Sequence, residues 1–320
     1  LPVRFEEESV WVNGKKVDHM VTDKGTPYQA LTATVPTGGS DRLELEVKHS
    51  GDRVDVEESL AERFHDIPKI LAVNPVDGRS YPLDISSGLN DNVTAIFHNR
   101  YDSPRSPYTT LQLPVNGIGE WCHPKDSARI DDAYLRGIGS LTISRDKLGT
   151  ANDLTFDIAQ GSNNIAYVSL YDNYPDSIEI AIDGSGNALA LLMAGSTNHM
   201  QAYTTNATVE VRYADGSAES VKLVPPYNWS PIEQDYYVDG KAFALPTPRQ
   251  IRMKLTDGTV SRDLGKDTGI DGVYGRRIDG GAANLLFVPL NPDKHLKTVI
   301  LKAEANEVVI GLIAASLIKD

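Results

Sequence analysis

The sequence predicts an all-β protein, with a small N-terminal β-sandwich unit in residues 1–67 and a jelly-roll-like sandwich in residues 68–320. Short apolar or alternating segments recur about every ten residues. Clusters of Gly, Pro, Asn and Asp separate these segments, and almost none of them has helical spacing. Many short strands with frequent turn signals are typical of sandwiches and jelly rolls.

The N-terminal unit is predicted from a hairpin signal and two alternating segments. Val10-Trp11-Val12 and Lys15-Lys16-Val17 flank Asn13-Gly14, a dipeptide that suits the positive φ angles of a tight hairpin turn. Residues 30–35 and 43–47 alternate apolar and polar side chains, as half-buried strands do.

The second unit is predicted around residues 187–229. A continuous apolar run there is of the buried-strand type, and a hairpin follows with its turn at Asp215-Gly216. Further strands are predicted at residues 93–98, 108–113, 140–143, 154–158, 165–170, 178–182, 250–255, 284–290 and 297–303. The apolar run 308–318 is about 11 residues long, too short to cross a bilayer, and predicts a buried strand.

Composition excludes several classes of partner. The chain carries 31 basic and 44 acidic residues, a formal charge of −13, which argues against nucleic acid and anionic membranes. No membrane insertion is expected. A single cysteine, Cys122, permits no disulfide within the chain. Because the sequence begins at Leu1, we expect a longer parent protein.

An aromatic and amide cluster is the first candidate binding site. Trp229 and Tyr236 offer rings on which a sugar can stack, and Asn228 and Asp235 offer groups that bridge its hydroxyls. The alternative is that Trp229 caps the sandwich core and the tyrosines seal its edge.

A second candidate cluster contains Arg105 and Trp121. The planar guanidinium of Arg105 suits a carboxylate such as that of a uronic acid. The alternative is that this arginine pairs with a nearby aspartate and holds a loop.

Acidic side chains suggest one metal site. Asp263, Asp267 and Asp271 provide the hard oxygen ligands that calcium prefers, so a structural calcium ion is a candidate cofactor. The alternative is a solvated acidic loop. The seven histidines are scattered without zinc-ligand spacing, and zinc is not expected.

Four stretches carry a family resemblance. They are Tyr101-Asp102-Ser103-Pro104-Arg105-Ser106-Pro107, residues 111–122, residues 228–236 and residues 306–312. Over roughly residues 75–318 the chain resembles the C-terminal β-sandwich (galactose-binding-like, jelly-roll) region of large Bacteroidetes polysaccharide-degradation proteins with six-hairpin-type glycosidase domains.

The resemblance implies a non-catalytic accessory module that binds or positions carbohydrate, in the periplasm, at the cell surface or secreted. It also implies a catalytic domain upstream in the same polypeptide. One alternative is a purely structural brace for that domain, and exposure distinguishes the two, because a binder must present Trp229 or Tyr236 to solvent. Another is an adhesion or surface-assembly module, which a large flat apolar patch on the first unit would favour.

A third alternative is that the chain is itself a glycoside hydrolase, which requires two carboxylates across a groove. No catalytic motif is present, and no catalytic residue is assigned. Were there a pair, the loop carboxylates Glu120, Asp132, Glu233 and Asp235 would be its candidates.

Overall fold

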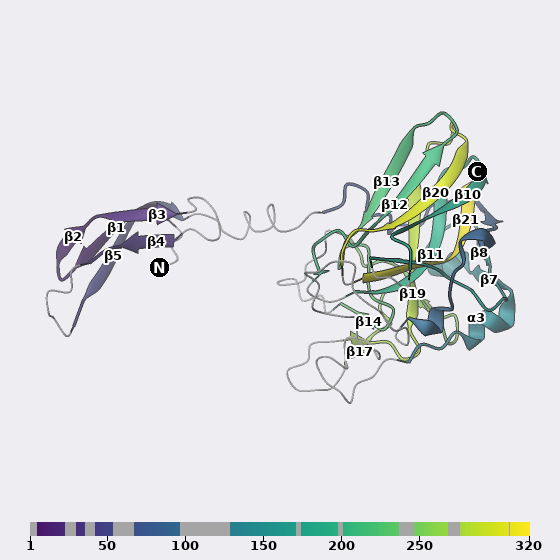
Figure 1. Cartoon of the computed structure of the whole chain (residues 1–320), viewed down its shortest axis with the longest axis horizontal. Coiled ribbons are helices and arrows are strands. Elements are labelled where there is room, and N and C mark those ends of the chain that lie inside the picture. Colours follow the sequence, from purple (N-terminus) through teal and green to yellow (C-terminus); the bar gives the residue numbers. More distant parts are fainter. Residues whose placement is uncertain are drawn as a thin grey trace. The chain divides into compact units, whose positions relative to one another are not determined.

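The protein is all-β, as predicted, and consists of two compact units, Leu1–Asp66 and Ile67–Asp320 (Figure 1). The computed structural model describes residues 5–22, 30–35, 42–53, 67–96, 129–170, 174–197, 201–236, 245, 247–267, 276–306 and 308–320. None of the described helices is long and apolar enough to span a membrane.

The first unit is built from two small sheets. Its strands are β1 (Phe5–Val12), β2 (Lys15–Val17), β3 (His19–Thr22), β4 (Ala30–Ala33) and β5 (Leu45–Arg53). They form one sheet in the order β2-β1-β5 and a β3–β4 pair. Asn13 (φ 48°) and Gly14 (φ 75°) make the predicted hairpin turn between β1 and β2. Val10, Val12 and Leu31 form its small described core.

The second unit contains the remaining strands. They are β6 (Arg79–Leu83), β7 (Ser140–Ile143), β8 (Leu154–Asp157), β9 (Ala166–Ser169), β10 (Ser177–Gly184), β11 (Ala188–Thr197), β12 (Ala207–Tyr213), β13 (Ala218–Leu223), β14 (Gln234–Asp235), β15 (Arg252–Lys254), β16 (Val260–Ser261), β17 (Lys266–Asp267), β18 (Arg276–Arg277), β19 (Ala282–Pro289), β20 (Leu296–Ala303) and β21 (Val308–Lys319). The short helices are η1 (Ser86–Gly88), η2 (Val93–Ala95), α3 (Ala133–Ile138) and α4 (Arg145–Leu148).

A seven-stranded sheet forms the centre of this unit. Its order is β16-β15-β19-β11-β21-β6, and β9 also pairs with β21. Every residue of β11 is buried, as is every residue of β21 except Lys319. Both faces of these central strands are covered, which explains their continuous apolar sequences. The buried strand predicted at residues 308–318 is confirmed.

The two faces of this sheet pack against different layers. One face, with Leu191 and Leu312, packs against a four-stranded sheet in the order β10-β20-β12-β13. The opposite face, with Leu192 and Phe287, is covered by the β7–β8 hairpin and by α3. The two sheets make the β-sandwich; β13, β12, β20 and β10 run side by side in Figure 1.

The four-stranded sheet has one buried and one open face. In β12, Val209 and Val211 are buried, whereas Thr208 and Glu210 on the other face are only partly covered. The β12–β13 turn has the predicted glycine at positive φ, Gly216 (φ 85°), and closes with a hydrogen bond from Tyr213 N to Ser217 O (2.9 Å).

One local prediction was wrong, and several short strands were not predicted. Residues 93–98 were expected as a strand, but Val93–Ala95 form a 3-10 helix. The Asn92 side chain accepts a hydrogen bond from Thr94 N (2.9 Å) and thereby favours the turn. Strand β6 was not predicted, because it contains Pro82 and lies at the sheet edge, where proline is tolerated.

Candidate functional site

The segment 224–236, which carries most of the predicted binding residues, is hydrogen-bonded to β11 and β19, two neighbouring inner strands of the large sheet. Ile232 N donates to Gly195 O in β11 (2.6 Å), and Ala282 N in β19 donates to Ile232 O (2.8 Å). These backbone hydrogen bonds place the side chains of the segment inside the molecule.

Trp229 is a core residue. Its side chain has 0% exposure and belongs to the cluster between the two sheets. Gly195 makes room for the ring, since a Cβ there would lie 3.0 Å from Trp229 Cζ2 and would overlap the Val309 carbonyl oxygen. The prediction that Trp229 stacks on a sugar is therefore wrong in this structure, because a large apolar ring gains more by closing the core.

Asn228 and Tyr236 are also interior residues. Asn228 is fully buried; its Oδ1 accepts from Val224 N (2.8 Å) and its Nδ2 donates to Lys222 O (2.8 Å). Tyr236 is 4% exposed, and burial raises the pKa of its phenol. Burial also raises the pKa of Tyr227 to about 12. Neither Asn228 nor Tyr236 presents the open surface that ligand binding requires. The burial of Tyr236 agrees with the alternative that the tyrosines seal the edge of the sandwich.

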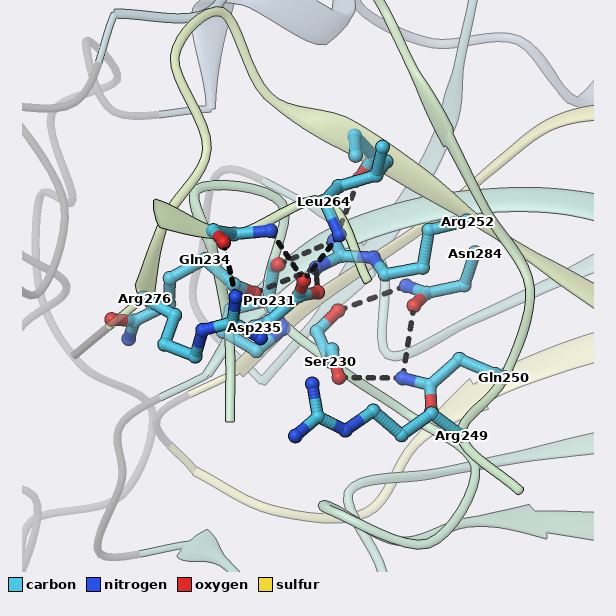
Figure 2. Close-up of polar contacts among 12 residues, drawn as sticks. Ser230, Pro231, Gln234, Asp235, Arg249, Gln250, Arg252, Leu264, Arg276 and Asn284 are labelled. Carbon is cyan, nitrogen blue, oxygen red and sulfur yellow. Dashed lines mark hydrogen bonds and ion pairs between the residues drawn. The ribbon is translucent and has the colours of Figure 1, made fainter. Parts of the chain in front are cut away.

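Asp235 and Arg252 form a buried ion pair at the centre of a polar network (Figure 2). Arg252 Nη1 lies 2.6 Å from Asp235 Oδ1 and donates to Gln234 O (2.7 Å). Its Nη2 donates to Pro231 O (2.7 Å) and Ala282 O (2.9 Å). The arginine thus joins β15, β19 and the segment 224–236.

The other carboxylate oxygen of Asp235 anchors a loop. Its Oδ2 accepts from Gly265 N (2.7 Å) and Leu264 N (3.1 Å). Burial alone would raise the pKa of Asp235, but the charge of Arg252 and these hydrogen bonds outweigh it, so the pKa lies below its usual value. Asp235 is consequently ionised at neutral pH and fully engaged within the protein.

A second buried polar cluster adjoins this pair. Gln250 Nε2 donates to Ser230 Oγ (2.5 Å), and Asn284 Nδ2 donates to Ser230 O (2.8 Å). The neighbouring cavity, lined in part by Asp235 and Arg252, measures about 10 Å³. That space suits about one water molecule and is far below the roughly 300 Å³ of a small-ligand pocket.

Two of the three predicted calcium ligands, Asp263 and Asp267, contact arginine. Asp263 Oδ1 lies 3.2 Å from Arg249 Nη1 and also pairs with Arg276, whose Nε lies 3.4 Å from Asp267 Oδ1. Within the described ranges, no group of three His, Cys, Asp or Glu side chains is arranged to hold a metal ion. Asp271, the third predicted ligand, lies outside the residues that the structure describes, so the calcium site stays a prediction.

Three of the four carboxylates considered for catalysis are buried. Asp132 (5% exposed) pairs with Arg136 (3.0 Å) and accepts from Asn164 Nδ2 (2.6 Å). Glu233 (3% exposed) accepts from Ser196 Oγ (3.4 Å), and Asp235 is described above. None of the three faces an open groove.

Four predicted residues fall outside the part of the chain that the structure describes. They are Arg105, Trp121, Glu120 and Asp271.

Sequence reasoning missed Arg252, the residue that organises the network. The local pattern gave no signal, because residues 251–255 alternate apolar and charged side chains and therefore predict Arg252 on a solvent-exposed face. A charge in a strand that is buried on both faces requires a buried partner. Spacing alone did not show that this partner would be Asp235.

Comparison with protein-family models gives no match for the sequence, and comparison with curated proteins gives no significant match. The fold and the internal network define a β-sandwich protein.

Proposed function

We propose that this chain is a non-catalytic accessory module of a glycan-degrading protein and that its sandwich braces a catalytic domain of that protein. The observation that carries the proposal is the burial of Trp229 (0% exposed) and Tyr236 (4% exposed). The same residues would be open to solvent in a module that binds sugar through this cluster.

The glycan-degrading context comes from the sequence resemblance over residues 75–318, and with it a periplasmic, cell-surface or secreted location. The internal network fits a bracing role, because Asp235 and Arg252 tie a loop and three sheet segments together. A rigid body of this kind suits a support for another domain.

The first test distinguishes a non-catalytic module from a glycoside hydrolase. The purified chain is incubated with a panel of plant and host polysaccharides, and reducing ends are measured. We expect no release above the buffer control, and release by the chain would overturn the proposal.

A pair of variants completes this test. Trp229→Ala should destabilise the fold by about 3–5 kcal/mol, because it opens a large cavity. Trp229→Phe should retain the fold with a smaller loss. If Trp229→Phe kept its thermal midpoint but lost glycan binding on an array, the ring would be a ligand contact and the bracing role would be wrong.

Direct carbohydrate contact is the second candidate function. It is favoured by an open polar hollow on the outer face of the four-stranded sheet, away from Trp229.

A further inference from the structure

The outer face of the four-stranded sheet contains a hollow of about 330 Å³, formed by side chains of β10, β12 and β20 and by Glu304. This volume lies at the lower end of the roughly 300–1,000 Å³ that small-ligand sites occupy. The face is the open side of the sandwich, and the strands beneath it are fixed by pairing on both sides of β12 and β20.

Strand register places two carboxylates on either side of an apolar floor. Glu179 in β10 and Glu210 in β12 are both direct cross-strand neighbours of Ile300 in β20. Adjacent strands are about 4.8 Å apart, so the two glutamate backbones stand about 10 Å apart across Ile300. The partly exposed Ile300 side chain offers an apolar surface between them.

Charged side chains close the rim of the hollow. Arg212 Nε lies 2.5 Å from Glu210 Oε1, and Lys302 Nζ lies 3.0 Å from Glu304 Oε1. Half of the Arg212 side chain is exposed, as is 56% of Lys302. Each group keeps unused donors or lone pairs, because a guanidinium has five N–H groups and a carboxylate accepts about four hydrogen bonds.

These features match a neutral sugar. A sugar ring has an apolar C–H face, which can lie on Ile300, and hydroxyl groups around its edge that accept from Arg212 and donate to Glu179 and Glu210. The lining has three carboxylates against two cations, a formal balance of −1, in a chain of charge −13. This balance disfavours uronic acids and sulfated or phosphorylated sugars.

We propose that this hollow is a binding site for a neutral oligosaccharide. The hydroxyl groups of the sugar hydrogen-bond to Glu179, Glu210 and Arg212, and the apolar face of a sugar ring packs on Ile300. The proposal rests on the accessory role in glycan degradation given above. It gives the module a contact surface that does not involve the buried Trp229 cluster.

The test is a glycan array on the full chain, followed by calorimetric titration of the strongest neutral hit. Glu179→Ala and Arg212→Ala remove exposed side chains, so their thermal midpoints should stay close to that of the parent chain. Each variant should bind the hit about tenfold or more weakly, since each loses hydrogen bonds to a charged group. The matched control is Ser220→Ala in β13, which pairs with Glu210 in register but does not line the hollow.

The outcomes separate this proposal from the proposed function. Weaker binding in both variants and unchanged binding in Ser220→Ala support the hollow. Equal binding in all four proteins, or a preference for uronic acids, overturns it. Absence of any glycan binding also overturns it, while the bracing role stands; release of reducing ends would instead overturn the non-catalytic role.

Discussion

Arg252 is held in the interior by four hydrogen bonds to protein atoms, and its side chain is only 2% exposed. We predict that Arg252→Met lowers the free energy of unfolding by about 3–5 kcal/mol, because it leaves the Asp235 carboxylate buried without its partner. Denaturant unfolding followed by circular dichroism measures the change.

The control for this substitution is the exposed pair Arg212–Glu210, where Arg212→Ala should cost less than about 1 kcal/mol. The double variant Arg252→Met/Asp235→Leu should recover part of the loss, since no lone charge remains. If Arg252→Met were as mild as Arg212→Ala, the buried pair would have no special weight in stability.

Asp235 also predicts how stability depends on acid. Its folded pKa lies below its usual value, so its contribution is present above the unfolded pKa of about 3.9 and is lost as pH falls through the lower folded pKa. The stability gap between the parent chain and Asp235→Asn should therefore narrow in acid. Thermal midpoints of both proteins from about pH 7 to about pH 2 test this, and a constant gap would contradict it.

The site residues show where sequence reasoning stops at this scale. The sequence Tyr227-Asn228-Trp229 is compatible with an exposed or a buried position, and its burial depends on contacts made only in the folded protein, such as the hydrogen bonds of Ile232 with β11 and β19. The two readings of Trp229 were both available from the sequence. The partnership of Asp235 with Arg252 was not, because it joins residues that meet only after the sheet forms.

At the level of elements, two glycines differ in whether the fold leaves room for a side chain. Gly195 in β11 faces the Val309 carbonyl and the Trp229 ring, so Gly195→Ala should destabilise by about 1–3 kcal/mol or more through overpacking. Gly137→Ala in α3 is the control, because a Cβ there meets nothing within 4 Å and alanine favours a helix by roughly 0.5–1 kcal/mol. Equal melting of the two variants would contradict the close approach of Trp229 to β11.

Elements with a clear pattern were predicted well. The hairpin β12–β13 and the strands β11, β19, β20 and β21 follow from alternation or continuous apolar runs. The two-residue strands β14, β17 and β18 were missed, because their pairing depends on a sheet assembled around Arg276 and Asp235 rather than on local pattern.

At the scale of the whole molecule, each described hydrophobic cluster draws its residues from one unit only. The second unit has two extensive clusters, whereas the described core of the first is three side chains. We predict that residues 67–320 expressed alone fold and melt cooperatively, because that unit has its own core. Calorimetry and far-ultraviolet circular dichroism test this; a fragment without a thermal transition would contradict it.

The central position of β21 affects how the protein is made. This strand pairs with β11 on one side and with β9 and β6 on the other, so it completes pairings with residues more than 100 positions earlier. During synthesis on the ribosome, the edges of β6, β9 and β11 that pair with β21 stay unpaired until residues 308–319 have emerged. During synthesis the nascent sandwich therefore exposes apolar strand edges, and chaperones that bind such edges should associate with it until the last central strand is added.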